Sequence, residues 1–297
     1  SLMSSILVTG GSGMVGKHLK EILPNATYIS SKDGDLKDPI YVNHLLSTYS
    51  PKTVIHLAAR VGGIQENINQ PADFFDDNIL MNTNMLKFSY KNNVENFIGV
   101  LSTCVYPDKI KNYPMTEKDM FLGPPTPTNF SYGYAKRCLA VQIEAYNKQY
   151  GTKYNYLIPS NLYSELDNFK HDTKMHFITS LLKKIKESED KVKLLGTGKP
   201  LRQFMYAGDF ARVIKEVVEN NITESFNIAC PENLTIDEMA RIAIKELKPN
   251  LFLQYFKPEL DGQYRKDVSC KKMKTLLPDF KFTPFTEGIK KVYDKIS

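Results

Sequence analysis

Short apolar runs alternate with longer amphipathic stretches over the first half of the chain. Residues 5–9 form an apolar run that ends in glycines, which indicates a buried strand. Residues 16–23 follow with the spacing of an amphipathic helix, and Pro24 ends it. The same alternation predicts further strands at 26–29, 53–57, 96–101 and 154–158, and helices at 41–49, 78–91 and 132–150. Strands that alternate with helices are typical of βαβ units, so we expect an α/β fold with a doubly wound parallel sheet.

The regular alternation ends near Pro159. Residues 164–174 are polar and loop-like, a helix is expected from 176 to 187, and short amphipathic stretches with Pro, Gly and Asn continue from there. We therefore expect a smaller C-terminal lobe that binds the substrate. The expected division is 1–162 plus about 204–222 for a dinucleotide-binding domain, and 163–203 with 223–297 for the second lobe.

Composition narrows the class of protein. Of the 297 residues 42% are hydrophobic, yet no apolar run approaches the roughly 20 residues of a membrane helix, and no signal region is evident. The four cysteines are far apart without a C-x-x-C pair, so we expect reduced thiols, a cytoplasmic location and no metal site. The net charge of +6 is mild, and the lysines near 183–186 lack interleaved aromatic residues, which argues against nucleic-acid binding.

A glycine-rich segment, residues 9–16, connects the first strand to the first helix. Glycines there allow a tight turn, a close approach to a pyrophosphate and close packing of helix on strand. The N-terminus of the helix then faces the phosphates. A tight turn without a ligand is the alternative, but this context predicts dinucleotide binding by a Rossmann-type fold. The residues expected at the cofactor here are Gly10, Gly13, Met14, Val15 and Gly16.

The end of the second strand bears on the choice between NAD and NADP. An NAD site normally carries an acidic residue there, which holds the ribose hydroxyls. Here Ser31 and Lys32 offer a hydroxyl and an ammonium that could take a 2′-phosphate, so NADP(H) is favoured. Asp33 and Asp35 are close enough to keep NAD open. The other residues expected along the cofactor are Asp35, Leu36, Ala58 and Ala59.

Tyr132 and Lys136 stand four residues apart on one face of a predicted helix. An ammonium near a phenol lowers the pKa of the phenol, which can then exchange a proton with a carbonyl oxygen while hydride is transferred. Ser102, at the end of the preceding strand, can donate a hydrogen bond to the same oxygen. Tyr134 is a competing phenol but lacks a lysine four residues later. After a dinucleotide turn, this set predicts a carbonyl reductase.

The constellation resembles the extended short-chain dehydrogenase/reductase family, and within it the GDP-L-fucose synthases. The resemblance implies an NADPH-dependent 4-reductase that also has 3,5-epimerase activity, acts on a GDP-4-keto-6-deoxy sugar and forms a homodimer. It covers nearly the whole chain. The segments that carry it are 58–64, 101–107, 159–163, 167–169, His176, 196–198, 202–204 and 261–263.

The resemblance also implies roles for individual residues. Tyr132 protonates the sugar O4, Lys136 tunes Tyr132 and holds the ribose, and Ser102 orients the carbonyl. Cys104 and His176 act as base and acid in epimerisation at C3 and C5. The residues implied beside the nicotinamide are Asn161 and Leu162, and those implied at the nucleotide-sugar are Arg202, Lys266 and Asn168.

The sequence departs from the family between Tyr163 and His176. Ser164-Glu165-Leu166 replaces the usual Gly-Pro-His, and the loop is one residue longer. Because this loop borders the sugar, an alternative is a 4-reductase without epimerase activity on a GDP-4-keto-heptose, in surface-polysaccharide biosynthesis. His171 on the same loop is a rival to His176, which is preferred because it opens an apolar helix. A non-enzymatic NADP-binding sensor is the third reading, and the intact Ser102, Tyr132 and Lys136 argue against it.

Overall fold

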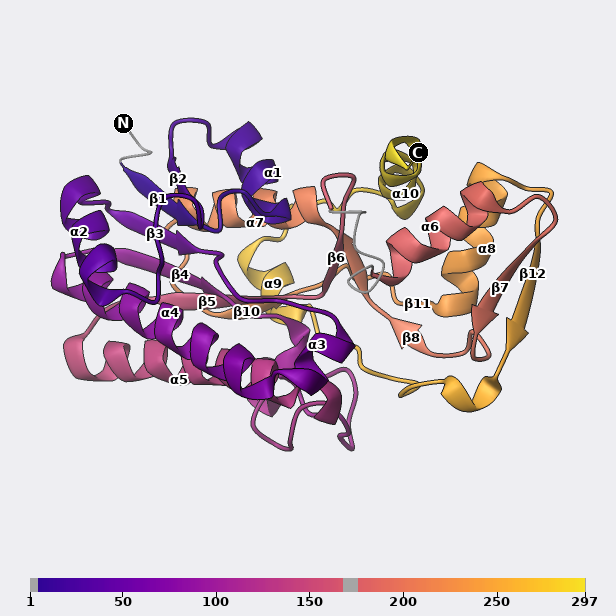
Figure 1. Ribbon diagram of the computed structural model, residues 1–297, viewed down its shortest axis with the longest axis horizontal. Helices are drawn as coiled ribbons and strands as arrows, with labels where there is room; N and C mark the ends of the chain where they lie inside the picture. Colours follow the sequence, from indigo (N-terminus) through magenta and orange to yellow (C-terminus); the bar gives the residue numbers. More distant parts are fainter. Residues whose placement is uncertain (1–4, 168–175, 297) are drawn as a thin grey trace.

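The computed structural model describes residues 5–167 and 176–296, and Figure 1 shows a larger lobe built on a sheet with a smaller lobe beside it. The sheet has six strands in the order β10-β5-β4-β3-β1-β2, and every neighbouring pair is parallel. This confirms the predicted doubly wound parallel sheet. The strands are β1 (Ile6–Thr9), β2 (Thr27–Ile29), β3 (Thr53–His56), β4 (Asn96–Val100), β5 (Asn155–Pro159) and β10 (Phe226–Ile228).

Helices cover both faces of the sheet (Figure 1). Successive strand residues point to opposite faces, so Leu7 joins one buried core while Ile6 and Val8 join the other. Burial on both faces explains why the strands read as continuous apolar runs. One face carries α2 (Pro39–Tyr49), α4 (Pro71–Lys91) and α5 (Phe130–Tyr150), and the other carries α1 (Met14–Ile22), α7 (Ala207–Glu219) and α9 (Lys271–Leu276).

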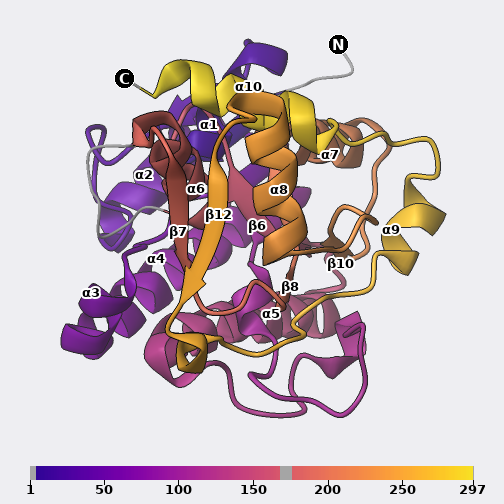
Figure 2. The same cartoon turned by 90° about the vertical axis from the view of Figure 1, so that its right-hand side faces the viewer.

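The smaller lobe, which faces the viewer in Figure 2, has its own core. In its strand β7 (Lys191–Leu195), Val192 and Leu194 are buried while the alternate residues face solvent, the pattern of a half-buried strand. Its elements are α6 (Phe177–Glu187), α8 (Ile236–Leu247), α10 (Phe285–Lys295), the parallel pair β7 and β12 (Phe252–Phe256), and the antiparallel pair β8 (Leu201–Arg202) and β11 (Leu234–Thr235). A further parallel pair, β6 (Asn161–Tyr163) with β9 (Phe204–Tyr206), lies where the chain passes between the lobes.

Several elements differ from the expectation. A short helix, α3 (Ile64–Asn69), precedes α4, and α4 begins at Pro71 instead of residue 78 because proline fits the first helical turn. β10 lies in the sheet and α9 packs against its core, although both fall within 223–297. We therefore propose that the first domain also includes about residues 223–229 and 271–277. Within the described residues, no helix has the length and apolarity needed to cross a bilayer.

Candidate active site

The glycine-rich turn closes tightly around the start of α1. Gly10 has a φ of +67°, in the left-handed region, and a Cβ there would lie 2.8 Å from the backbone nitrogen of Ala58. A Cβ on Gly16 would lie 2.6 Å from the carbonyl oxygen of Gly11. Among the described side chains none caps the helix at Gly13, so its first N–H groups are available to a phosphate. The residues present therefore fit the pyrophosphate of a dinucleotide.

The turn after β2 leaves its hydroxyl and ammonium groups accessible. Ser31 and Lys32 are exposed, whereas the Asp33 carboxylate accepts hydrogen bonds from the Ser30 backbone N–H at 2.8 Å and from the Ser30 hydroxyl at 3.4 Å. The Asp33 carboxylate is thus occupied by hydrogen bonds within its own turn. This arrangement fits a 2′-phosphate better than a pair of ribose hydroxyls.

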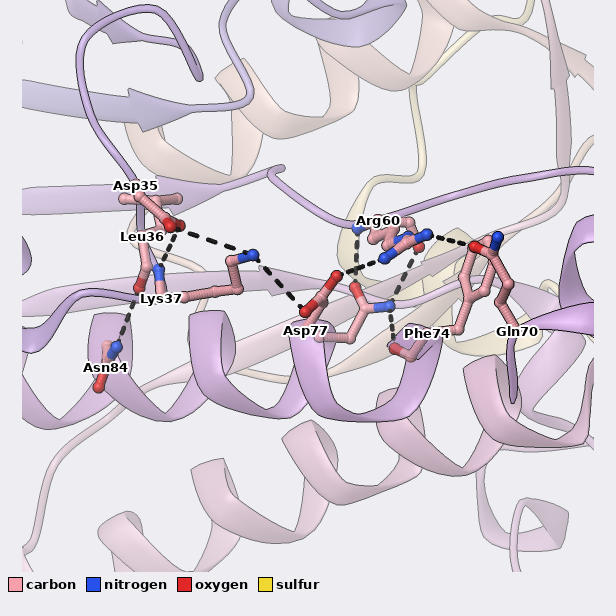
Figure 3. Close-up of polar contacts among 9 residues, drawn as sticks. Asp35, Leu36, Lys37, Arg60, Gln70, Phe74, Asp77 and Asn84 are labelled. Atoms are coloured by element: carbon pink, nitrogen blue, oxygen red, sulfur yellow. Dashed lines mark hydrogen bonds and ion pairs between the residues drawn. The ribbon is translucent and has the colours of Figure 1, made fainter. Parts of the chain in front are cut away.

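Asp35 and Leu36 are held against α4 (Figure 3). Lys37 donates its backbone N–H to Asp35 at 2.9 Å, and its ammonium lies 3.6 Å from Asp77 of α4. Asn84 of the same helix donates to the carbonyl of Leu36 at 3.0 Å. The edge expected to border the adenine is therefore held by contacts within its own turn and to α4.

Asp77, which pairs with Lys37, also pairs with Arg60 (Figure 3). Arg60 donates to Asp77 at 2.7 Å, and its backbone N–H donates to the Asn78 side chain at 2.9 Å. Asn78 returns a hydrogen bond to the Arg60 carbonyl at 3.0 Å. The segment that follows Ala58 and Ala59 is thereby anchored to α4.

A chain of buried polar side chains positions Ala58, and no sequence pattern indicates it. The Ala58 N–H donates to the Thr9 hydroxyl at 3.1 Å, Thr9 lies 2.7 Å from His56 Nδ1, and His56 Nε2 lies 2.8 Å from the Asn82 oxygen. Burial lowers the pKa of His56 to about 4, so the imidazole is neutral. His56 is therefore a structural link between strand and helix at the cofactor.

Ser102, Cys104, Tyr132 and Lys136 come together where β4 ends. Ser102 follows the strand and accepts a hydrogen bond from the Cys104 N–H at 3.1 Å, at the start of the short 3₁₀ turn η1 (Thr103–Val105). Lys136 donates to the carbonyl of Val100 at 2.8 Å, and its Nζ lies 5.7 Å from the centre of the Tyr132 ring. Parallel strands put their carboxyl ends at one edge, which is where α/β folds bind ligands.

Burial dominates the electrostatics of this cluster. It raises the pKa of Tyr132 and lowers the pKa of Lys136 to about 8. Our expectation that the phenol has a lowered pKa is wrong for this structure, because burial, followed by the charge of Cys104, raises it. Tyr132 is therefore protonated at neutral pH, the form that donates a proton to a carbonyl. Burial also raises the pKa of Cys104, against opposing effects of Ser102 and the charges of Lys136 and Arg137.

His176 is not part of the described cluster. It is exposed and is the residue before α6, and its side chain makes no capping hydrogen bond among the described residues. Asn168 and His171 lie outside the described residues. The pairing of Cys104 with His176 therefore stays a prediction.

Two cations from the smaller lobe approach the reaction centre. Arg202 donates to the carbonyls of Leu201 at 2.7 Å and Gln263 at 2.6 Å, and burial lowers its pKa. Burial, followed by the positive charge of Arg202, lowers the pKa of Lys266. Cys104 acts on that pKa in the opposite direction, so Lys266 and the thiol lie close enough to interact.

Lys266 and Asn161 have partners that the sequence did not reveal. Lys266 lies 3.7 Å from Asp108 and 3.5 Å from the Thr126 hydroxyl. The exposed Asn161 donates to the carbonyl of Gln203 at 3.3 Å, and Leu162 is half-buried beside it. Asp108 and Thr126 stand in a segment without periodicity, so no sequence pattern indicated them.

In the part of the chain that the structure describes, no group of His, Cys, Asp or Glu side chains could hold a metal ion.

A dinucleotide turn, a parallel sheet and a Ser-Tyr-Lys set at the strand ends define a nicotinamide-dependent oxidoreductase. The model of the NAD dependent epimerase/dehydratase family matches residues 6–229, and the chain belongs to this family.

Individual relatives are more specific. The chain is 37% identical to a GDP-L-fucose synthase of Dictyostelium discoideum, over 96% of this chain and 93% of the relative. It is similar to the crystal structure of a GDP-L-fucose synthetase from Naegleria fowleri bound to NADP, with a TM-score of 0.87 and 34% identity over 99% of this chain and 93% of that one. A GDP-D-glycero-L-gluco-heptose synthase from Campylobacter jejuni aligns with a TM-score of 0.88 and 25% identity over 99% of this chain and 98% of that one.

Proposed function

We propose that this enzyme is an NADPH-dependent 4-reductase with 3,5-epimerase activity on a GDP-4-keto-6-deoxy sugar, the reaction of a GDP-L-fucose synthase. The observation that carries the proposal is the placement of Cys104 beside Ser102, Tyr132 and Lys136 at one strand edge. The relatives named GDP-L-fucose synthase and the neighbour bound to NADP support the substrate and the cofactor.

Epimerisation uses the acidity that the 4-keto group gives to the protons at C3 and C5. The Cys104 thiolate removes a proton from one face, and His176 returns one to the opposite face. Ser102 and Tyr132 donate hydrogen bonds to O4, which carries the enolate charge. Because burial raises the pKa of Cys104, formation of the thiolate depends on Ser102 and the nearby cations.

Reduction uses the other residues of the cluster. Bound NADPH would supply the hydride, and the residues of the glycine-rich turn with Ser31 and Lys32 would hold it. Tyr132 gives its proton to O4 as the carbonyl becomes a hydroxyl. The Lys136 ammonium, 5.7 Å from the centre of the Tyr132 ring, stabilises the phenolate that remains. Once the ketone is gone, C3 and C5 are no longer acidic and the configuration is fixed.

Arg202 and Lys266 are proposed to bind the diphosphate of the substrate, since Lys266 is a cation that interacts with the thiol and Arg202 is a second cation close to Lys266. The homologous heptose proteins keep a GDP-4-keto-heptose open as the second substrate. Glu165, one of the three residues that depart from the family, accepts hydrogen bonds from Tyr206 at 2.7 and 2.8 Å.

The proposal includes a cytoplasmic homodimer that pairs α4 and α5. Leu80 of α4 is 46% exposed and Val141 of α5 is 50% exposed, so these neighbouring helices present apolar side chains outward. The four cysteines are free thiols, which suits a reducing compartment. Light scattering after gel filtration tests the dimer: a monomer mass for wild type contradicts it, and Val141→Glu should convert a dimer to monomers.

The experiment that tests the function is incubation with NADPH and GDP-4-keto-6-deoxymannose, or its heptose counterpart, in D2O. We expect NADPH oxidation with the hexose and deuterium at C3 and C5 of the product by NMR. Reduced product without ring deuterium would contradict only the epimerase activity and would leave the reductase activity supported. Oxidation only with the heptose would establish the alternative substrate, and no oxidation with either would refute the reductase.

A further inference from the structure

Arg137 follows Lys136 in α5 and is a buried cation, with 5% of its surface exposed. A buried guanidinium is unfavourable unless its N–H groups have partners. Here Nε donates to the carbonyl of Val105 at 2.6 Å, and Nη2 donates to the carbonyl of Gly123 at 2.7 Å. Both acceptors are backbone groups, so these bonds leave the positive charge without a neutralising carboxylate.

The contacts of Arg137 fix the turn that carries Cys104. Val105 is the last residue of η1, and its N–H donates to the Ser102 carbonyl at 3.1 Å. Arg137 therefore holds the carboxyl end of the same turn whose beginning Ser102 holds. Four residues earlier on the same helix face, a Cβ on Gly133 would lie 3.4 Å from the Cys104 carbonyl oxygen. Helix α5 thus packs directly on the backbone of the thiol.

Arg137 also reaches the far side of the loop between η1 and α5. Gly123 precedes Pro124, whose carbonyl accepts the Asp108 N–H at 2.9 Å. Asp108 in turn lies 3.7 Å from Lys266. The guanidinium stacks over the rings of Phe121 at 5.8 Å and Tyr134 at 5.2 Å, which excludes water from it. One side chain therefore ties the Cys104 turn to the loop that contacts the substrate lobe.

Several groups act on the thiol. The Ser102 hydroxyl and the cations Lys136 and Arg137 favour its ionised form. Among the described residues, Tyr132 and Lys266 are two further titratable groups that interact with it. Lys136 is already bound to the Val100 carbonyl and faces the Tyr132 ring. Arg137 is the cation that donates a hydrogen bond to the turn that carries the thiol.

We propose that Arg137 is a positioning residue for epimerisation, which clamps the Cys104 turn on α5 and stabilises the thiolate. Gly133 and Arg137 then hold the Cys104 turn on the same helix that carries Tyr132 and Lys136. This inference rests on the proposed function. In the step concerned, the C–H bond at C3 or C5 breaks, the proton goes to sulfur, and the electron pair remains as the enolate. No oxidation or reduction takes place in that step.

The test compares Arg137→Met, Arg137→Lys and the control Arg241→Met, which removes an exposed arginine from α8 of the other lobe. Each protein is assayed for deuterium uptake at C3 and C5, and for NADPH oxidation with ketone that has already been epimerised. We expect Arg137→Met to slow deuterium uptake by about 100-fold and to change the reduction rate by less than about threefold. The control should leave both rates at the wild-type level.

A second readout separates charge from general disruption. The pH dependence of Cys104 alkylation by iodoacetamide is followed by peptide mass spectrometry, because three other cysteines are present. We expect its midpoint to rise by about one pH unit in Arg137→Met, and to stay near wild type in Arg137→Lys, which keeps the charge but not the two-pronged contact. Arg137→Lys should still lose deuterium uptake.

The outcomes are distinguishable. Equal losses of both activities in folded Arg137→Met, or an unchanged alkylation midpoint, would overturn the role of Arg137. If wild type takes up no deuterium, the proposed epimerase activity fails, and the alkylation midpoint still decides whether Arg137 controls the thiol. If Arg137→Met does not fold, wild-type behaviour of Arg137→Lys in both activities would refute the clamp.

Discussion

Replacing Lys136 with methionine should change how the free energy of unfolding depends on pH. Lys136 is 4% exposed, and burial lowers its pKa from 10.5 to about 8. Below about pH 8 the folded and the unfolded chain both bind the proton, and between about pH 8 and 10.5 only the unfolded chain does. The unfolded state then binds more protons, so the contribution of Lys136 to the free energy of unfolding rises with pH across that window.

The size of the effect follows from the shift in pKa. Each unit is worth about 1.4 kcal/mol, so a fall from 10.5 to about 8 corresponds to about 3 kcal/mol. Wild type should gain about that much stability relative to Lys136→Met between about pH 7 and pH 10.5. Loss of the hydrogen bond to the Val100 carbonyl adds an offset that does not vary with pH. The offset cancels when the difference between the two proteins is followed as the pH is raised.

The assay is urea unfolding of the cofactor-free proteins, followed by circular dichroism at several pH values in this range. Lys148→Met is the control, since it removes an exposed lysine from the same helix. The stability difference between wild type and Lys136→Met should shift in favour of wild type as the pH rises. A constant difference would refute the conclusion that Lys136 is held as a destabilised, buried cation.

Three further substitutions test the cofactor and reaction sites. Gly16→Ala places a Cβ 2.6 Å from the Gly11 carbonyl, so it should destabilise the protein by about 1–3 kcal/mol, read as a lower denaturation midpoint, and weaken NADPH binding in a fluorescence titration. Lys32→Ala should weaken NADPH binding by about tenfold and leave NADH binding unchanged, whereas equal losses would remove Lys32 from the 2′-phosphate site. Tyr132→Phe should slow NADPH oxidation by about 100-fold or more with unchanged NADPH affinity, and near-full activity would exclude Tyr132 as the proton donor.

The alternation of apolar runs and amphipathic stretches was sufficient to predict the sheet and most of its helices, because burial on one or two faces imposes a period on the sequence. It was insufficient outside that regular alternation. Helix α3 spans six residues, too few to show a helical period, and β10 lies in the second half of the chain, where strands and helices no longer alternate regularly. The early start of α4 lies in an acidic stretch, where the polar residues hide the helix that Pro71 begins.

The chemistry of the site was predictable to the extent that it is local. Tyr132 and Lys136 are four residues apart, and Gly10 to Gly16 form one turn, so both sets are visible in the sequence. The electrostatics are not local, since the pKa of Lys136 depends on the depth at which α5 meets β4. Arg137 reads as one more charged residue on a helix, and only the packing of η1 against α5 shows that it is buried.

The placement of Lys136 and Arg137 suggests why two adjacent cations are buried in one helix. Each donates to backbone carbonyls, Lys136 to Val100 and Arg137 to Val105 and Gly123, and these dipoles offset only part of the desolvation. The remaining positive potential lies where the proposed reaction forms negative charge, on sulfur, on the enolate oxygen and on the phenolate. Because these groups are fixed before the substrate binds, little reorganisation is needed as each anion forms. The instability predicted for Lys136 is thus the thermodynamic counterpart of its proposed role in catalysis.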